Sequence, residues 1–381
     1  QAANRWWDGT NIGGTGDGSS DGGTETWNTT TQNWDQGNGS ARVSWTNANN
    51  DTAIFAGTAG TVALGTGITI GGLQFDTASY IIQSNTLTWG TAGNIVVNED
   101  ATIGAIMAGS VAITKSGSGA LTLTAKSTST GGLTVDAGTL ILKATGNAGT
   151  IRGALTVNSG ATVTSTVANS MGILTPVNPL NINGGNVDLS AGQHQFLGVT
   201  VNMVGGTLKF SSSTQNEHSD AVYNISNSTS QARILAQPGG AMRMISSAIA
   251  PCITFNVEDG SQDVDLLVDA PITVGSGAGG LTKAGAGTVE FTKVNTYTGP
   301  TAINAGRVFI NGTSSGVSAH TVEIGATLAG TGTVNGATTV NGIIAPGSIA
   351  SATGTLNIVG NVSWNGASDN ALTTRDWYFD L

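Results

Sequence analysis

The chain has 381 residues, including 57 glycines, and charged residues make up only 9% of it. Such an apolar, weakly charged composition excludes a disordered polymer, and glycine without an every-third-residue period excludes collagen. The net charge of −10 comes with no cluster of lysine or arginine, which argues against nucleic acid and anionic membranes as partners. Since no run approaches the roughly 18 apolar residues of a membrane helix, we expect no membrane insertion in this chain.

Residues 1–60 are the first predicted region, a tryptophan-rich N-terminal cap. It holds five of the eight tryptophans, which are Trp6, Trp7, Trp27, Trp34 and Trp45. A stack of strands exposes an unpaired edge at its end, and bulky apolar side chains would cover that edge. The alternative is an aromatic platform for a glycan, because the faces of tryptophan rings stack on sugars.

Residues 61–365 are predicted to form a rod built from a repeated strand–turn–strand motif. Clear copies are residues 133–138 (LTVDAG), 155–160 (LTVNSG) and 180–185 (LNINGG). Their alternation places leucine, valine and isoleucine on one face of each strand and threonine or asparagine on the other. Asparagine, aspartate and glycine then bend the chain, because they tolerate positive φ. The turn glycines recur at intervals of 19 to 25 residues.

Two architectures have short strands at such intervals. An antiparallel sandwich would need two-residue hairpins and domains of roughly 100 residues with separate cores, and neither is evident. A right-handed parallel β-helix needs about 20 residues per coil and stacks identical turns above one another. The sequence therefore predicts an all-β, right-handed parallel β-helix (a β-solenoid), in which successive asparagines form a ladder.

Two segments depart from this rhythm. Residues 211–250 lack the regular turns, so they form either a loop that protrudes from the rod or coils with wider turns. Residues 366–381 are the third predicted region, a C-terminal aromatic segment with Trp377, Tyr378 and Phe379. These side chains would close the far end of the rod or dock on a neighbouring molecule. Deleting residues 370–381 is therefore expected to lower self-association.

Residues suited to catalysis are few. The three histidines, His194, His218 and His320, are isolated in the sequence, and no Gly-x-Ser-x-Gly stretch supplies a serine nucleophile. Cys252 lies in an apolar setting and is predicted to be a buried, inert thiol. We therefore expect a chain that is not an enzyme.

One acidic pair is a candidate for metal binding. Asp263 and Asp265 alternate along the chain, so on a strand they would share one face and ligate Ca²⁺. The alternative is a row of surface carboxylates on an acidic protein. No other cofactor is expected.

A longer repeat spans residues 113–145 and 281–313. Eleven of its 33 positions are identical between the two copies, without a gap. The second copy contains GLTKAGAGTV at 280–289, NTYTG at 295–299 and INAG at 303–306. This pattern resembles the passenger-associated repeat of bacterial autotransporters. The resemblance implies a secreted β-helical passenger, extracellular and displayed at the bacterial cell surface or shed from it. No translocator barrel is expected in this chain.

Two non-enzymatic functions fit these features. The rod would be an adhesin-like stalk that holds a binding loop away from the cell, with a glycan or another host-surface molecule as its ligand. Alternatively, it would be a structural subunit that associates end to end into fibres or a surface layer. A further alternative is a β-helix protein that binds or degrades a polysaccharide.

Overall fold

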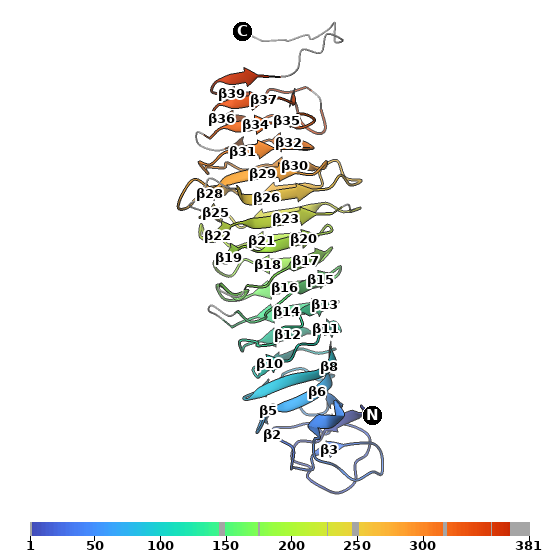
Figure 1. Ribbon diagram of the computed structural model, residues 1–381. Coiled ribbons are helices and arrows are strands. Elements are labelled where there is room, and N and C mark those ends of the chain that lie inside the picture. The colour runs from blue at the N-terminus through green and yellow to red at the C-terminus, as the bar shows by residue number, and fades with distance from the viewer. Residues whose placement is uncertain are drawn as a thin grey trace.

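The structure is a computed structural model that describes residues 2–144, 149–173, 176–226, 228–245, 251–314, 318–351 and 353–365. It is a column of short strands stacked along one axis, with β2 and β3 near one end and β39 near the other (Figure 1). Apart from the 3-10 helix η1 (Asn47–Asn49), every regular element in the described part of the chain is a strand. The all-β class is therefore confirmed.

The strands form two long walls and two short ones. The first wall has 18 strands: β1 (Asn4–Trp7), β3 (Trp34–Asp35), β4 (Thr52–Phe55), β6 (Ile68–Phe75), β8 (Thr86–Val97), β10 (Ile106–Ala108), β11 (Ile113–Ser116), β13 (Leu133–Val135), β15 (Leu155–Asn158), β17 (Leu180–Asn183), β20 (Thr200–Met203), β23 (Ala221–Ile225), β26 (Pro251–Val257), β29 (Gly280–Ala284), β31 (Thr301–Ile303), β34 (His320–Val322), β37 (Thr338–Val340) and β40 (Val362–Trp364).

The second wall has 15 strands: β2 (Glu25–Trp27), β5 (Thr61–Leu64), β7 (Tyr80–Gln83), β9 (Ala101–Ile103), β12 (Ala120–Leu123), β14 (Gly138–Leu142), β16 (Ala161–Ser165), β18 (Asn186–Leu189), β21 (Thr207–Phe210), β24 (Ala232–Ala236), β27 (Leu266–Asp269), β30 (Thr288–Phe291), β32 (Arg307–Ile310), β35 (Thr327–Gly330) and β38 (Ile343–Pro346). The third wall has four strands: β19 (Gln195–Leu197), β22 (Asn216–Ser219), β25 (Met242–Met244) and β28 (Ile272–Val274). The fourth wall has three: β33 (Thr313–Ser314), β36 (Thr333–Asn335) and β39 (Asn357–Val359).

Successive coils of the chain pair in parallel. In the first wall Leu133 lies opposite Leu155, which in turn lies opposite Leu180. The second wall follows chain order throughout, from β2 to β38. Among the described strands, β1 and β3 are the only antiparallel pair. A parallel β-solenoid is therefore confirmed and the sandwich is excluded, while the right-handed sense of winding stays a prediction.

A single apolar core fills the column from the tryptophans at its start to Val334. It arises from the alternation within each strand, because every second side chain points between the walls. In β15, for example, Leu155 and Val157 are buried, whereas Thr156 and Asn158 are partly exposed.

Side-chain hydrogen bonds follow the stacking on the outside of the column. Asn158 donates from Nδ2 to Asp136 at 2.6 Å, and Asn183 donates to Asn158 at 3.1 Å, so the predicted ladder at the turn is confirmed. A second ladder runs along the middle of the first wall. Nδ2–Oδ1 distances of 2.8, 2.9 and 3.4 Å join Asn181, Asn202, Asn224 and Asn256 in that order.

The described residues of 211–245 belong to stacked coils, so the interpretation of this segment as a protruding loop is wrong. They contain β22 to β25, each paired in parallel with strands of the neighbouring coils. One of these coils is longer than the others: Asn224 and Asn256 are 32 residues apart. The two preceding coils also contain third-wall strands, but their ladder asparagines are only 21 and 22 residues apart. Residues 246–250, the end of the predicted segment, lie outside the described residues.

Candidate functional site

The predicted N-terminal cap contains a cluster of tryptophan rings. Trp7, Trp27, Trp34 and Trp45 are at most 2% exposed, and the centroids of neighbouring rings lie 4.8–5.0 Å apart. The rings pack in tilted and edge-to-face arrangements. Of the five tryptophans only Trp6 is partly exposed. A sugar-binding role at this end of the rod stays a prediction, and among these side chains Trp6 is the one that a glycan could reach.

A buried ion pair holds the loop beside this cluster. The Arg42 Nε donates to the carboxylate of Asp8, which has no exposed surface. The same guanidinium donates to the carbonyls of Gly13 and Thr15 at 3.2 and 3.1 Å. Burial raises the pKa of Asp8, and the hydrogen bond from Arg42 opposes that shift. Because an unpaired buried carboxylate is costly, the pair fixes the loop of residues 8–15 to Arg42.

Each copy of the 33-residue repeat buries one lysine at the same position. Lys115 has no exposed surface, although it is a strand residue between two glycine-rich turns. Its Nζ donates to the carbonyls of Gly117 and Ala137 at 3.2 and 2.8 Å. Gly117 belongs to the turn of the same coil and Ala137 to the turn of the next coil. The ammonium therefore joins two successive turns, and we call this arrangement the lysine latch.

The second copy repeats the lysine latch with one more hydrogen bond. Lys283 Nζ donates to the carbonyls of Ala284, Gly285 and Ala305 at 2.9, 2.7 and 3.0 Å. Burial lowers the pKa of both lysines to about 8, and the negative charges of Asp100 (for Lys115) and Asp265 (for Lys283) oppose this shift. The carbonyls replace the water that a buried ammonium has lost.

Glycine is required where two of these turns meet. Gly138 and Gly306 have positive φ values of 64° and 69°, which disfavour any other residue. A Cβ at Gly306 would lie 2.4 Å from the carbonyl oxygen of Gly287, and one at Gly138 would lie 2.6 Å from that of Gly117. The lysine and glycine frame of the repeat therefore encodes a turn that stacks tightly on the preceding coil.

The two copies differ at a corner further along the coil. The second copy has Asn295 there, and its Oδ1 accepts a hydrogen bond from the backbone nitrogen of Ile272 at 2.8 Å. The first copy has Ser127 at the same position, and its Oγ donates to the carbonyl of Met107 at 3.1 Å. Either side chain binds the backbone of the preceding coil, so the corner needs a polar residue and not a particular one.

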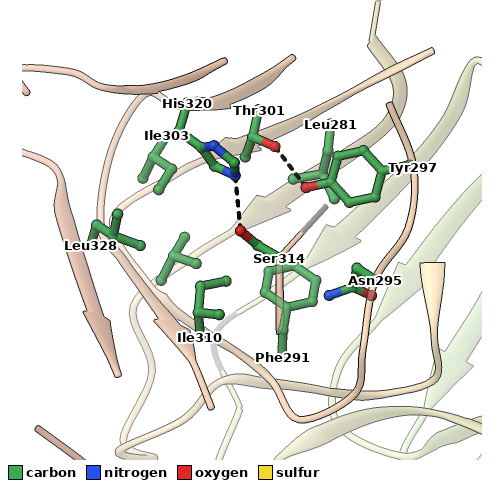
Figure 2. A pocket seen from close by; sticks show the side chains of 11 residues that line it. Leu281, Phe291, Asn295, Tyr297, Thr301, Ile303, Ile310, Ser314, His320 and Leu328 are labelled. Atoms are coloured by element: carbon green, nitrogen blue, oxygen red, sulfur yellow. Dashed lines mark hydrogen bonds between the residues drawn. The ribbon is translucent and has the colours of Figure 1, made fainter. Parts of the chain in front are cut away.

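A small cavity lies inside the coils of the second copy. Its volume of about 10 Å³ suits a single water molecule. Figure 2 shows the hydroxyl of Tyr297 turned towards Thr301, at 2.6 Å, and His320 turned towards Ser314, at 3.0 Å. Most of the remaining lining is apolar, from Leu281 to Leu328. This cavity is a packing gap in the core, too small for an organic ligand.

The histidines and the cysteine contribute to the core. His194, His218 and His320 are at most 1% exposed, and burial lowers the pKa of each to about 4. Around His218, the Tyr223 hydroxyl lies 2.8 Å from Nε2 and the Asn216 carbonyl 2.9 Å from Nδ1. Cys252 is buried beside them, as predicted. Neutral, enclosed imidazoles of this kind cannot reach a substrate outside the rod.

Asp263 and Asp265 lie in the turn that precedes β27, so the expectation that they share a strand face is wrong. Asp265 turns inward because its carboxylate accepts hydrogen bonds from the backbone nitrogens of Gly260 and Thr288, both at 2.8 Å. Asp263 is exposed. No group of three His, Cys, Asp or Glu residues that could hold a metal occurs in the described part of the chain. The Ca²⁺ site stays a prediction.

The sequence did not indicate a hollow of about 400 Å³ on the outside of the second wall. Its lining residues come from distant coils: Asp263, Val264, Glu290, Asn311, Ser348, Ile349 and Ala350. The stacking of the coils brings Ser348 and Asp263 to the same hollow. No local sequence motif indicates this arrangement.

The predicted self-association residues Trp377, Tyr378 and Phe379 lie outside the described residues. The part of the chain that the structure describes contains no helix with the length and hydropathy needed to cross a membrane.

Comparison with known proteins identifies the 33-residue repeat. Residues 113–142 and 281–308 each match the family model of the Passenger-associated-transport-repeat. The chain carries two transport repeats. Both matched segments include their latch lysine and the glycine that stacks on the preceding coil, so the matched pattern coincides with the geometry described above.

One curated relative is similar beyond the transport repeats. The Adhesin BmaC autotransporter of Brucella suis biovar 1 (strain 1330) is 38% identical over 171 residues, which are 43% of this chain and 5% of that protein. The chain therefore spans only a small fraction of the length of this relative. No solved structure matches the chain.

Proposed function

We propose that this chain is part of the passenger of a surface-displayed, adhesin-like autotransporter and has no catalytic role. The observation that carries this proposal is the 38% identity to an adhesin autotransporter, on a chain with two transport repeats. The physical form agrees with it, because a column of parallel coils extends its outer turns far from the point of attachment. An extracellular location follows from the same proposal.

The distribution of polar groups supports a binding role over a catalytic one. Among the described residues, the three imidazoles are enclosed in the core and Asp265 is bound by backbone nitrogens. General acid–base catalysis needs a titratable group within reach of the substrate. The outer turns, in contrast, present exposed polar side chains such as Asp263, and exposed loops on a rigid scaffold commonly carry recognition.

A cell-binding assay tests the proposal. Beads coated with the purified full chain are expected to adhere to cultured mammalian cells. In a variant of the chain used for comparison, the exposed turn of residues 258–263 is replaced by the short turn sequence of residues 136–138. This variant tests whether the exposed turn contributes to adhesion. If the full chain adheres no better than uncoated beads to any cell type, the adhesin assignment is wrong. Hydrolysis of a polysaccharide panel by the pure chain would instead establish the enzymatic alternative.

End-to-end association is a second proposal, carried by one surface. The last described coil exposes large apolar side chains: Ile343 is 55% exposed, Val359 51%, Val362 49% and Trp364 38%. Exposed apolar patches mark contact surfaces, and an open strand edge pairs readily with another chain. Light scattering and negative-stain microscopy are expected to show filaments that shorten in Val359→Ser and Val362→Ser variants. Monomeric rods at all concentrations would eliminate this proposal.

A further inference from the structure

The hollow on the second wall spans several coils of the rod. Asp263 precedes β27, Glu290 lies in β30, and Asn311 follows β32, three successive strands of the wall. Ser348 and Ala350 follow β38, two strands further along. The hollow is therefore bounded at one end by the turn of residues 258–265 and at the other by the turn of residues 348–351. Its volume of about 400 Å³ is in the range of sites that bind small ligands.

The first of these turns is held rigid by the neighbouring coil. Gln262 donates from Nε2 to the carbonyl of Thr229 at 2.8 Å. Inside the turn, Asp265 accepts hydrogen bonds from the backbone of Gly260 and Thr288. These three hydrogen bonds hold the turn on both sides of Asp263 without using its own carboxylate. The wall is therefore formed before a ligand arrives, which lowers the entropy cost of binding.

The second turn is also attached to the rod. Gly347 donates from its backbone nitrogen to the carbonyl of Gly330 at 3.0 Å, and Ser351 donates to the carbonyl of Ser348 at 3.2 Å. These bonds fix the three lining residues 348–350 as a tight turn. Ile349 and Ala350 contribute apolar side chains to the lining.

The charges in the hollow are negative and only partly compensated. Glu290 accepts a hydrogen bond at Oε1 from Asn311 at 2.7 Å, and Asn311 Oδ1 in turn accepts one from Thr331. Within the described residues, neither Glu290 Oε2 nor the Asp263 carboxylate has a hydrogen bond or an ion pair. No lysine, arginine or histidine belongs to the lining. The lining therefore contains two carboxylates and no cation.

We propose that this hollow binds a lysine or arginine side chain of a basic protein segment. An ammonium or guanidinium would pair with Asp263 and Glu290, and its aliphatic stem would pack on Ile349 and Val264. A bare Ca²⁺ ion fits less well, because it needs six to eight oxygen ligands at about 2.4 Å, and the amide of Asn311 is already bound. The size of the hollow suits a side chain with its stem. The assignment does not depend on surface display, since it concerns the isolated chain.

Fluorescence anisotropy of a labelled hexalysine peptide tests this site on the purified full chain. The double variant Asp263→Asn, Glu290→Gln is expected to weaken binding about tenfold or more, because it removes both charges and leaves the shape. Ala350→Trp is expected to weaken binding by a similar factor, because the indole fills the hollow without changing its charge. Circular dichroism establishes that each variant is folded.

Two controls decide between this site and general acidity. Asp259→Asn removes an exposed charge on the same turn but outside the hollow, and it is expected to leave the affinity within about twofold. A hexaglutamine peptide is expected not to bind. Equal weakening by Asp259→Asn and the double variant, or no effect of Ala350→Trp, would overturn the proposal. Competition by millimolar Ca²⁺ or by a neutral oligosaccharide such as maltohexaose at the wild-type hollow, lost in the double variant, would reassign the site to that ligand.

Discussion

The two transport repeats share one turn and differ at one corner, and the contrast shows what such a repeat must specify. At the turn, Lys115 and Lys283 each donate to a carbonyl of their own turn and to one of the turn in the next coil. A Cβ at Gly138 or Gly306 would lie 2.6 or 2.4 Å from a carbonyl oxygen of the preceding coil. At the corner, serine in the first repeat replaces asparagine in the second. Backbone geometry dictates the turn, whereas the corner asks only for a polar group.

The corner of the second repeat is better satisfied than that of the first. Tyr297 has Thr301 as its hydrogen-bond partner, whereas the hydroxyl of Ser129, the equivalent residue in the first repeat, is buried without one. Lys283 also has three carbonyl partners, where Lys115 has two. Since an unpaired buried polar group is costly, the second repeat is expected to be locally more stable at neutral pH.

Acidic pH should make the second repeat locally less stable than the first, and this is the largest effect that we expect. The three buried histidines have pKa values of about 4 in the folded chain, below the ordinary value of 6.5, and all follow residue 190. Between these values the unfolded chain binds more protons than the folded one. The free energy of unfolding is therefore highest, with respect to these histidines, above pH 6.5. It falls as the pH drops towards 4, by up to about 3 kcal/mol per histidine.

Hydrogen exchange with mass spectrometry checks this prediction. At pH 4.5 the segment 281–308 should lose protection before the segment 113–142, after correction for the intrinsic exchange rate. The variant His320→Asn, which removes the imidazole nearest the second repeat, should reduce the difference in protection between the two segments. Simultaneous loss of protection in both repeats would mean that the histidines do not make one repeat more sensitive to acid than the other.

Alanine at the stacking glycines is the next largest perturbation. Gly306→Ala should lower the free energy of unfolding by about 3 kcal/mol, because Cβ would overlap the carbonyl of Gly287 and strain the backbone. Gly138→Ala should cost about the same. Gly160→Ala is the matched control, since Gly160 also has positive φ (82°) but no atom within 4 Å of its Cβ position. Urea unfolding gives the three values, and an equal loss in the control would attribute the effect to φ alone.

Removal of the latch ammonium should have a smaller effect. Lys283→Met leaves three carbonyls without their donor and is expected to lower the free energy of unfolding by about 2 kcal/mol. Lys115→Met should cost less, because two carbonyls are affected. Lys126→Met, at an exposed lysine, should change nothing beyond error. A gain in stability for Lys283→Met would show that the burial cost of the charge exceeds its hydrogen bonds.

The smallest effect concerns the corner itself. Asn295→Ser gives the second repeat the residue of the first and should lower the free energy of unfolding by about 1 kcal/mol, through the bond to Ile272. Ser127→Asn is the reverse exchange. Thermal unfolding compares the stabilities of the two variants. A loss of stability for Asn295→Ser as large as that for Gly306→Ala would show that the corner is as strictly specified as the turn.

The sequence predicts those parts of the molecule that repeat locally. Alternation in residues such as Leu155 and Val157 and the turn residues Asp136, Asn158 and Asn183 indicated both the parallel stacking and one ladder. The coil from Asn224 to Asn256 was less evident, because its 32 residues interrupt the period of 19 to 25 residues. The inward turn of Asp265 was missed, since it depends on backbone nitrogens from another coil. The hollow, assembled from several coils, left no signal at all.

A distance between the two transport repeats tests the stacked solenoid most directly. Thr114 and Thr282 are equivalent, partly exposed positions on the first wall, seven strand-to-strand steps apart. Spin labels at Thr114→Cys and Thr282→Cys should give a narrow electron–electron distance distribution centred near about 34 Å, from a spacing of about 4.8 Å per step. Cys252 is buried and should stay unlabelled. A distance below about 20 Å would place the repeats side by side and contradict the solenoid.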